Sequence, residues 1–309
     1  DGLVDLSKKD LRYDFHTKID YANLKKLNFM KDSISVFKGD IEMNISGNSI
    51  DNLAGIVKIS QTAYQNQQDN YIFDDFTLES SFDANNERTI TINSPDIIEG
   101  KLVGKFKFNQ LLKMVENAAG SLYANYTPNK VSRGQYLKFN FSVYNKIIEI
   151  FYPGIEIGAN TMVRGSINSD KDEFKLVFNS PGIKAFDNYF DKIKIDIDNK
   201  NPLYNAYVEM DTIKTKYYKF SEFSFINVTA NDTLFARTEF KGGKKADDFY
   251  NLNFYHTIDK QNNSVVGLKK SEVKFKDYLW FLNEDETSDN KIVFDKKFKN
   301  FAIENFVMT

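Results

Sequence analysis

Apolar and polar residues alternate along several stretches of the chain. Ile41, Met43 and Ile45 alternate with acidic and polar residues, and the same period of two recurs in residues 137–143 and 192–198. Successive side chains of a strand point to opposite faces, so this period is typical of a strand with one apolar face and one wet face. The pattern therefore predicts a protein built mainly from strands.

Short polar clusters, such as 83–86 and 241–244, separate these stretches and predict tight turns between antiparallel neighbours. Glycines 39, 47 and 55 stand eight residues apart and are expected to form corners, because glycine accepts unusual backbone dihedrals. The five prolines all lie outside the alternating stretches, as a hydrogen-bonded ladder requires. These features predict an all-β, mainly antiparallel fold.

One or two short helices are expected in addition. Asn109 is placed to cap a helix that ends at Gly120. Its expected apolar face consists of Leu111, Leu112, Val115 and Ala118. The chain is expected to form one continuous segment over 1–309, with a soft boundary near 109–134. Because it does not begin with Met, it is also expected to be part of a longer protein.

Composition removes several classes of function. Forty-one Lys and Arg against 43 Asp and Glu leave a net charge of -2, so the basic stripe of a nucleic-acid-binding protein is missing, and no nucleic-acid partner is expected. The chain has no cysteine, which excludes disulfides, thiolate metal sites and cysteine nucleophiles. The sequence contains no run of 18 apolar residues, so no transmembrane helix is predicted.

Candidate catalytic and metal-binding groups are weak. The only two histidines, His16 and His256, stand apart from other ligand types. The acidic residues of 196–198 are not followed by the remainder of a calcium loop. Carboxylate pairs such as 74–75 and 284–286 arise readily among 43 acidic residues. The sequence therefore predicts no enzyme, no cofactor and no metal site.

An apolar sheet face must be covered by a second sheet, by closure into a barrel, or by something that is not protein. Aromatic residues make up 15% of the chain, yet few helices are available to cover them. A sandwich or barrel would bury this face, whereas a curled trough would leave an apolar groove, which marks a binding site. The candidate groove residues are Ile41, Met43, Ile45, Phe76, Leu78, Leu102, Phe106, Phe108, Leu137, Phe139, Phe141, Val143, Ile193, Ile195, Ile197, Val208, Met210, Phe223, Phe225, Leu252, Phe254, Val273 and Phe275.

The spacing of glycine and apolar residues resembles one known family. The resemblance is carried by 22–59, with its core FKGDIEMNISGNSIDNLAGIVKI, by 71–81 (YIFDDFTLESS), by 88–108 (RTITINSPDIIEGKLVGKFKF) and by 145–167. These segments resemble the TamB branch of the AsmA-like proteins, in the form found in Bacteroidetes. The resemblance contains no catalytic signature.

The resemblance implies an elongated, curled sheet with a U-shaped groove, called a β-taco. It implies a periplasmic bridge that carries phospholipid between the inner and outer membranes along the groove and assists outer-membrane assembly. An N-terminal anchor in the inner membrane, missing from this sequence, and a partner of the Omp85 class in the outer membrane are also implied. The alternative is an envelope or secreted β-sandwich that binds carbohydrate or protein.

Overall fold

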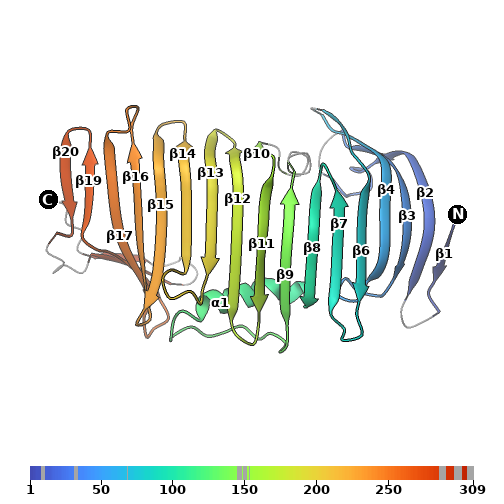
Figure 1. Ribbon diagram of the computed structural model, residues 1–309, viewed down its shortest axis with the longest axis horizontal. Helices are drawn as coiled ribbons and strands as arrows, with labels where there is room; N and C mark the ends of the chain where they lie inside the picture. Colours follow the sequence, from blue (N-terminus) through green and yellow to red (C-terminus); the bar gives the residue numbers. More distant parts are fainter. Residues whose placement is uncertain are drawn as a thin grey trace. The chain divides into compact units, whose positions relative to one another are not determined.

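The computed structural model describes residues 1–7, 11–30, 34–67, 69–144, 148, 152, 154–284, 290–295 and 301–304. Strands contain 61% of the residues, and the strands of the described part join one antiparallel sheet that does not close into a barrel (Figure 1). The all-β, antiparallel prediction is confirmed.

The elements follow one another in a simple order. They are β1 (Gly2–Asp5), β2 (Arg12–Asn23), β3 (Val36–Ser46), β4 (Ala54–Gln65), β5 (Asn70–Ile72), β6 (Phe76–Phe82), β7 (Arg88–Ser94), β8 (Ile98–Lys105), the 3₁₀ turn η1 (Phe108–Gln110), α1 (Leu111–Gly120), β9 (Tyr136–Val143), β10 (Ile155–Ile157), β11 (Thr161–Asn168), β12 (Glu173–Ala185), β13 (Asn188–Asp198), β14 (Ala206–Lys214), β15 (Lys219–Ala230), β16 (Thr233–Gly242), β17 (Asp248–Ile258), β18 (Ser264–Leu268), β19 (Ser271–Phe275), β20 (Tyr278–Leu282), β21 (Lys291–Phe294) and β22 (Phe301–Glu304).

The chain divides into two compact units. Unit 1 contains Asp1–Gln110 and Gln135–Arg164, and unit 2 contains Leu111–Gly134 and Gly165–Thr309. In unit 1, β1 to β4 pair in sequence order, β4 pairs with β5 and β6 at its two ends, and β6 to β9 continue the meander. In unit 2, β12 to β17 form a second run of hairpins. The sheet then divides, because one end of β17 pairs with β18 and the other with β19.

Bulges bend the strands of unit 1. The register of β2 against β3 shifts between Ile19 and Ala22, and the register of β3 against β4 shifts between Lys38 and Asp40. At this shift two residues of β4, Gln61 and Thr62, lie opposite the single residue Gly39 of β3. The φ of Gln61 is 49°. A bulge bends its strand and increases the local twist. Figure 1 shows β2, β3 and β4 curving at the ends that carry these bulges.

The glycines expected at corners have three different positions. Gly39 lies inside β3 beside the bulge, and Gly47 follows the last residue of β3 with a φ of +133°. Gly55 is the second residue of β4 and pairs with Ile45. The prediction is therefore wrong for Gly55, which belongs to the ladder rather than to a corner.

The helix forms near its predicted position, and of its predicted apolar face only Leu112 is exposed, while Ala118 is buried and Leu111 and Val115 are intermediate. Met114 and Ala118 are fully buried, whereas Leu112 is 69% exposed. Residues four apart lie on the same side of a helix, so Met114 and Ala118 form one stripe that excludes Leu112. Asn109 belongs to η1 instead of capping α1. Another expectation also fails, since Pro181 lies inside β12.

Candidate functional site

Cross-strand register brings the predicted groove residues of unit 1 onto one face. Met43 lies opposite both Phe15 and Val57, and Val57 lies opposite Leu78. Directly opposed residues of an antiparallel pair point to the same side. Following the register from β2 to β9 gives the apolar face of unit 1: Tyr13, Phe15, Ile41, Met43, Ile45, Val57, Ile59, Phe76, Leu78, Ile90, Ile92, Ile98, Leu102, Leu137, Phe139, Phe141 and Val143.

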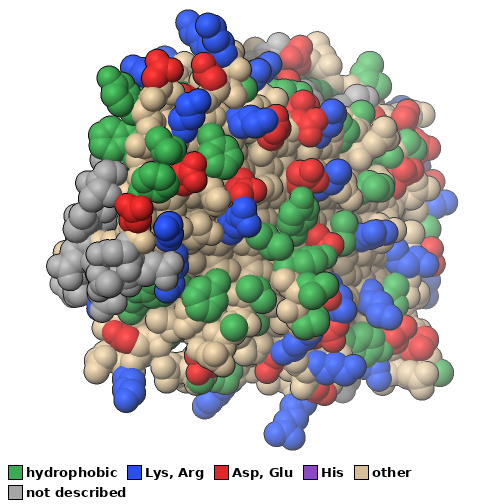
Figure 2. All heavy atoms as spheres, turned by 60° about the vertical axis from the view of Figure 1, so that its left-hand side comes forward, with side chains coloured by type: hydrophobic (Ala, Val, Ile, Leu, Met, Phe, Trp, Pro, Cys, Tyr) green, Lys and Arg blue, Asp and Glu red, His purple; other side chains and the backbone are tan. Residues whose placement is uncertain are grey.

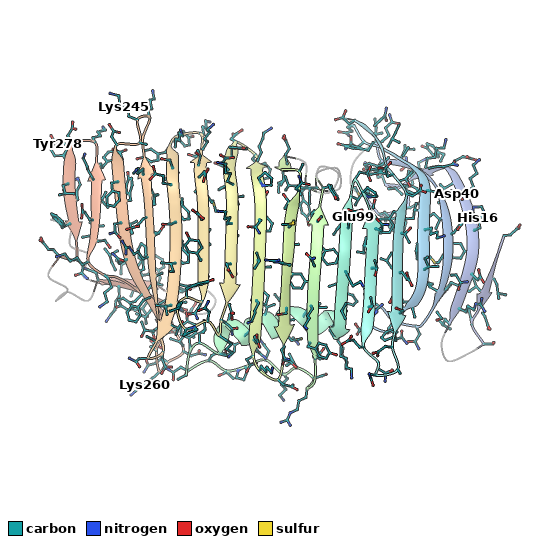
Figure 3. The ribbon with its side chains drawn as sticks, viewed as in Figure 1. His16, Asp40, Glu99, Lys245, Lys260 and Tyr278 are labelled. Carbon is teal, nitrogen blue, oxygen red and sulfur yellow. The ribbon has the colours of Figure 1, made fainter. Side chains whose placement is uncertain are left out.

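The opposite face of unit 1 is polar. Glu42 lies opposite His16 and Lys58, and Lys101 lies opposite Asn140. His16 Nε2 contacts Asp40 Oδ1 across β2 and β3, where both side chains point the same way (Figure 3). The sheet of unit 1 therefore has one apolar and one wet side.

Unit 2 repeats this arrangement. Ile195 lies opposite Phe178 and Val208, and Val208 lies opposite Phe225. The apolar face of unit 2 consists of Leu176, Phe178, Ile193, Ile195, Ile197, Val208, Met210, Phe223, Phe225, Phe240, Tyr250, Leu252, Phe254, His256, Val266, Leu268, Val273, Phe275 and Trp280. All predicted groove residues of β13 to β19 belong to this face.

Two predicted groove residues are placed differently. Strand β8 ends at Lys105, so Phe106 and Phe108 lie beyond it, and Phe108 begins η1. Their rings contact each other edge to face, with centroids 5.3 Å apart. The alternation continues in the sequence, but the ladder to β9 stops at Lys105. Phe106 is buried with this cluster rather than lining an open strand.

The groove residues predicted from the sequence do not include several members of these faces. Val57 and Ile59 follow Ile56, and three apolar residues in four positions obscure the alternation. Ile90 and Ile92 alternate with Thr89 and Thr91, which is a period-two signal that the sequence itself contains. Phe240 and Tyr250 stack with centroids 4.5 Å apart, a contact that depends on the register of β16 and β17.

Most side chains of the apolar faces are partly covered by protein and keep some exposed surface. Of the predicted groove residues, Phe106, Leu137 and Ile193 are buried, Phe275 is 41% exposed, and the others are intermediate. Core residues of a domain are usually covered on all sides by other side chains. In Figure 2, hydrophobic side chains remain visible on the surface among charged ones. These faces are therefore accessible to a ligand.

Arg88 closes one end of the apolar face of unit 1. Its guanidinium donates hydrogen bonds to the carbonyls of Ile50 and Leu53, both at 2.7 Å, and to Ser80 Oγ at 2.9 Å. Only 5% of the residue is exposed. Burial lowers the pKa of Arg88, an effect that nearby Asp51 opposes. Arginine stays charged even so, and Arg88 thus fixes the 50–53 turn across this end.

A segment after α1 covers one end of the apolar face of unit 2. The Tyr123 hydroxyl and His256 Nδ1 form a hydrogen bond of 2.7 Å, and Asn125 Nδ2 donates to the carbonyl of Ile258 at 2.9 Å. Asn199 Nδ2 donates to the carbonyl of Ala118 at 2.6 Å, which fixes α1 at the end of β13. Figure 1 shows α1 at the lower ends of β12 and β13.

An aromatic cluster lies at the other end of the same face. Tyr218 donates to the buried carboxylate of Asp248, and its hydroxyl lies 3.1 Å from that of Tyr250. The backbone N–H of Lys276 donates to Asp248 Oδ1 at 2.6 Å. Burial and the Asp248 carboxylate raise the pKa of Tyr218 strongly. These contacts hold β15, β17 and β19 together.

No known protein family, curated protein or solved structure matches the chain. Within the described residues, no group of three or more His, Asp and Glu is placed to hold a metal ion. Of the 284–286 carboxylates, only Glu284 is described, and its two neighbours lie outside the described residues. No helix in the described part is long and apolar enough to cross a membrane.

The Tyr123–His256 contact predicts that stability depends on pH. Burial raises the pKa of Tyr123 to about 12, so its hydroxyl stays protonated beside His256 Nδ1 and can donate to the tautomer of neutral His256 that carries its proton on Nε2. Burial also lowers the pKa of His256 below its ordinary 6.5. The unfolded chain therefore binds this proton more readily, and the stability from neutral His256 is lost as pH falls below about 6.5.

We expect the free energy of unfolding to fall more between pH 7.5 and 5.5 for the wild type than for His256→Gln. Glutamine can accept the Tyr123 hydrogen bond but does not titrate. Urea unfolding followed by the fluorescence of Trp280, the single tryptophan and part of the same unit, measures this difference. Identical pH dependence in the two proteins would contradict the assignment.

Proposed function

We propose that the chain binds phospholipid through acyl chains that lie on the apolar faces of its sheet. The observation that carries this proposal is the register: residues alternating in sequence align across strand after strand into one partly exposed apolar surface per unit. Each CH₂ removed from water contributes about 0.8 kcal/mol. Headgroups remain in water beside the sheet.

The lining of these faces suits lateral movement along the sheet. In unit 1 the surface consists mainly of Ile, Leu, Val and Phe side chains, most of them partly exposed. A surface of uniform affinity lets a chain move from one strand to the next without a single deep minimum. The proposed activity is therefore conduction of phospholipid, with no chemical step and no cofactor.

The resemblance to TamB-like proteins extends the proposal to the whole parent protein. In this view the chain is an internal segment of a periplasmic bridge between inner and outer membranes that contributes to outer-membrane assembly. The inner-membrane anchor and the contact with an Omp85-class protein then belong to parts of the parent outside this sequence. An open sheet face supports this proposal over a carbohydrate- or protein-binding sandwich, which needs a second sheet.

Photo-crosslinking from paired neighbouring positions tests the lipid claim. A benzophenone side chain at Phe139 or Ile195 is expected to capture phospholipid in a membrane extract, because both positions lie on apolar faces. The matched controls are Asn140 and Lys194, which are exposed on the opposite side. Mass spectrometry of the adducts identifies the captured lipid. Equal capture from both members of each pair would contradict the assignment of these residues to opposite faces.

A further inference from the structure

The polar side of unit 2 carries an apolar strip. Ser224 lies on this side, opposite Glu209 in β14 and Glu239 in β16. Two residues further along β15, Ile226 points to the same side and lies opposite Tyr207. The strip therefore begins next to charged residues, on the side that the alternation assigns to water.

The register extends this strip across neighbouring strands. Val228 lies opposite Phe235, and Phe235 lies opposite Tyr255. Ile226 and Phe235 are each 38% exposed, and Leu203, in the turn between β13 and β14, is 79% exposed. Large apolar side chains that gather on the water-facing side of a sheet mark a contact surface.

A groove runs over the strip, and we call it the β15–β17 groove. The apolar part of its lining consists of Leu203, Ile226, Val228 and Phe235. Its volume is about 490 Å³, which lies within the range of about 300–1,000 Å³ that is typical of ligand sites.

The charged residues that line the β15–β17 groove are all cations. They are Arg237, Lys269 and Lys270, and no Asp or Glu of the described residues belongs to the lining. Arg237 pairs with Glu239, whereas neither lysine forms an ion pair with another described residue. The whole chain has a net charge of -2, so the positive charge here is local. A ligand that complements this groove is anionic.

Asn253 fixes the two lysines beside the strip. Lys269 and Lys270 connect β18 to β19, at the place where the sheet divides. The N–H of Lys269 donates to the carbonyl of Asn253 at 2.8 Å, and Asn253 Nδ2 donates to the carbonyl of Lys270 at 2.9 Å. The Lys269 ammonium lies 5.9 Å from the ring centroid of Tyr255. The backbone of both lysines is thus held at the groove before a ligand binds, which lowers the cost of ordering it.

We propose that the β15–β17 groove binds an acidic peptide segment of a partner protein. A large apolar side chain of the peptide lies on Ile226 and Phe235, and carboxylates on either side of it lie against Lys269 and Lys270. Side chains two residues apart in an extended peptide share one side and are about 6.8 Å apart, so one short segment supplies both kinds of group.

The position of the groove separates it from the proposed lipid surface. Phe225 belongs to the apolar face of unit 2, and its neighbour Ile226 points to the other side of the sheet. The sheet therefore lies between a phospholipid on the apolar face and the cations of the groove. A neutral carbohydrate would leave those cations without a counterpart. An acidic peptide is the occupant that uses both the apolar strip and the positive charge.

Fluorescence anisotropy with defined peptides tests the proposal on the full chain. The probe is a fluorescein-labelled peptide of sequence DEDFDED, and one-to-one binding is expected. Two control peptides, DEDSDED and NQNFNQN, change only the apolar side chain or only the charge, and each is expected to bind about tenfold more weakly. Raising NaCl from about 0.1 to about 1 M shortens the Debye length from about 10 to about 3 Å, so affinity for DEDFDED is expected to fall about fivefold.

Charge reversal locates the site. Lys269→Glu combined with Lys270→Glu is expected to lower affinity for DEDFDED about tenfold or more, because two attractions become repulsions. The matched control is Lys244→Glu combined with Lys245→Glu, an exposed lysine pair of the same unit outside the groove lining, which is expected to bind as the wild type does. Phe235→Ser is expected to lower affinity for DEDFDED about fivefold and to reduce the preference for DEDFDED over DEDSDED.

Each contrary outcome overturns a stated part of the proposal. Equal loss of affinity in the two lysine-pair variants overturns the site, and equal binding of DEDFDED and DEDSDED overturns the apolar contact. If vesicles that contain phosphatidylglycerol bind and DEDFDED does not, the cations face a lipid surface and the peptide proposal is wrong. Phospholipid crosslinking at Ile195 is expected to be unchanged by Lys269→Glu with Lys270→Glu, because the two sites lie on opposite sides of the sheet.

Discussion

Replacing Arg88 with alanine is expected to lower the free energy of unfolding by about 3 kcal/mol or more. The substitution removes the donors to the carbonyls of Ile50 and Leu53 and to Ser80 Oγ. The carbonyl of Leu53 keeps a hydrogen bond from Ser80 Oγ at 2.7 Å, and a buried acceptor left without any donor costs about 1–3 kcal/mol. The guanidinium also lies over the rings of Phe82 and Phe108, at 5.3 and 5.6 Å from their centroids, and these contacts are lost as well.

Urea unfolding followed by circular dichroism measures the effect. Arg12→Ala is the matched control, because Arg12 is exposed and pairs with Asp14 in a surface ion pair. Such pairs contribute about 0–1 kcal/mol. Arg88→Lys keeps the charge but cannot reproduce the planar fork, so an intermediate loss is expected. If Arg88→Ala and Arg12→Ala unfold at the same urea concentration, Arg88 does not stabilise the end of the face.

Gly55→Ala is expected to cost at least about 3 kcal/mol, because both the dihedral and the space exclude a side chain. The φ of Gly55 is +128°, and a Cβ there would lie 2.1 Å from the carbonyl oxygen of Asn44 and 2.8 Å from the Cα of Ile45. Both contacts are backbone atoms of the paired strand, so only separation of β3 from β4 relieves them. The apolar face of unit 1 would be interrupted at this pair.

Gly134→Ala separates the two causes. The φ of Gly134 is +71°, but no atom lies within 4 Å of a Cβ placed there, so only the dihedral penalty of about 1 kcal/mol is expected. The comparison uses the midpoint and slope of urea unfolding for both variants. A Gly55→Ala protein as stable as Gly134→Ala would show that β3 and β4 accommodate the methyl group.

Much of the candidate site could be predicted from local pattern. Ile41, Met43 and Ile45 share a face because the period of a strand is two, and no tertiary information is needed to say so. The same reasoning placed Ile193, Ile195 and Ile197 together on β13. It failed for Phe106 and Phe108, because alternation persists in the sequence after the partner strand has ended.

Residues that close the ends of the faces could not be predicted. Arg88 precedes an alternating stretch, where a charged side chain is expected to lie in solvent at the end of a strand. It is buried instead, and it donates hydrogen bonds to carbonyls that lie 35 and 38 residues away in the sequence. Tyr123 and His256 are 133 residues apart, and their contact depends on the path of the segment after α1. Contacts at such separations leave no local periodic signal.

The sequence by itself determined that this protein is a sheet of antiparallel strands, each with an apolar and a polar side, and where its helix lies. Only the tertiary structure decided how those sides align, because register depends on the partner strand as much as on the strand itself. The bulge at Gln61 is the clearest case, since one extra residue places Thr62 and Tyr64 on the same side as Ile59 and opens an apolar pocket that strict alternation excludes.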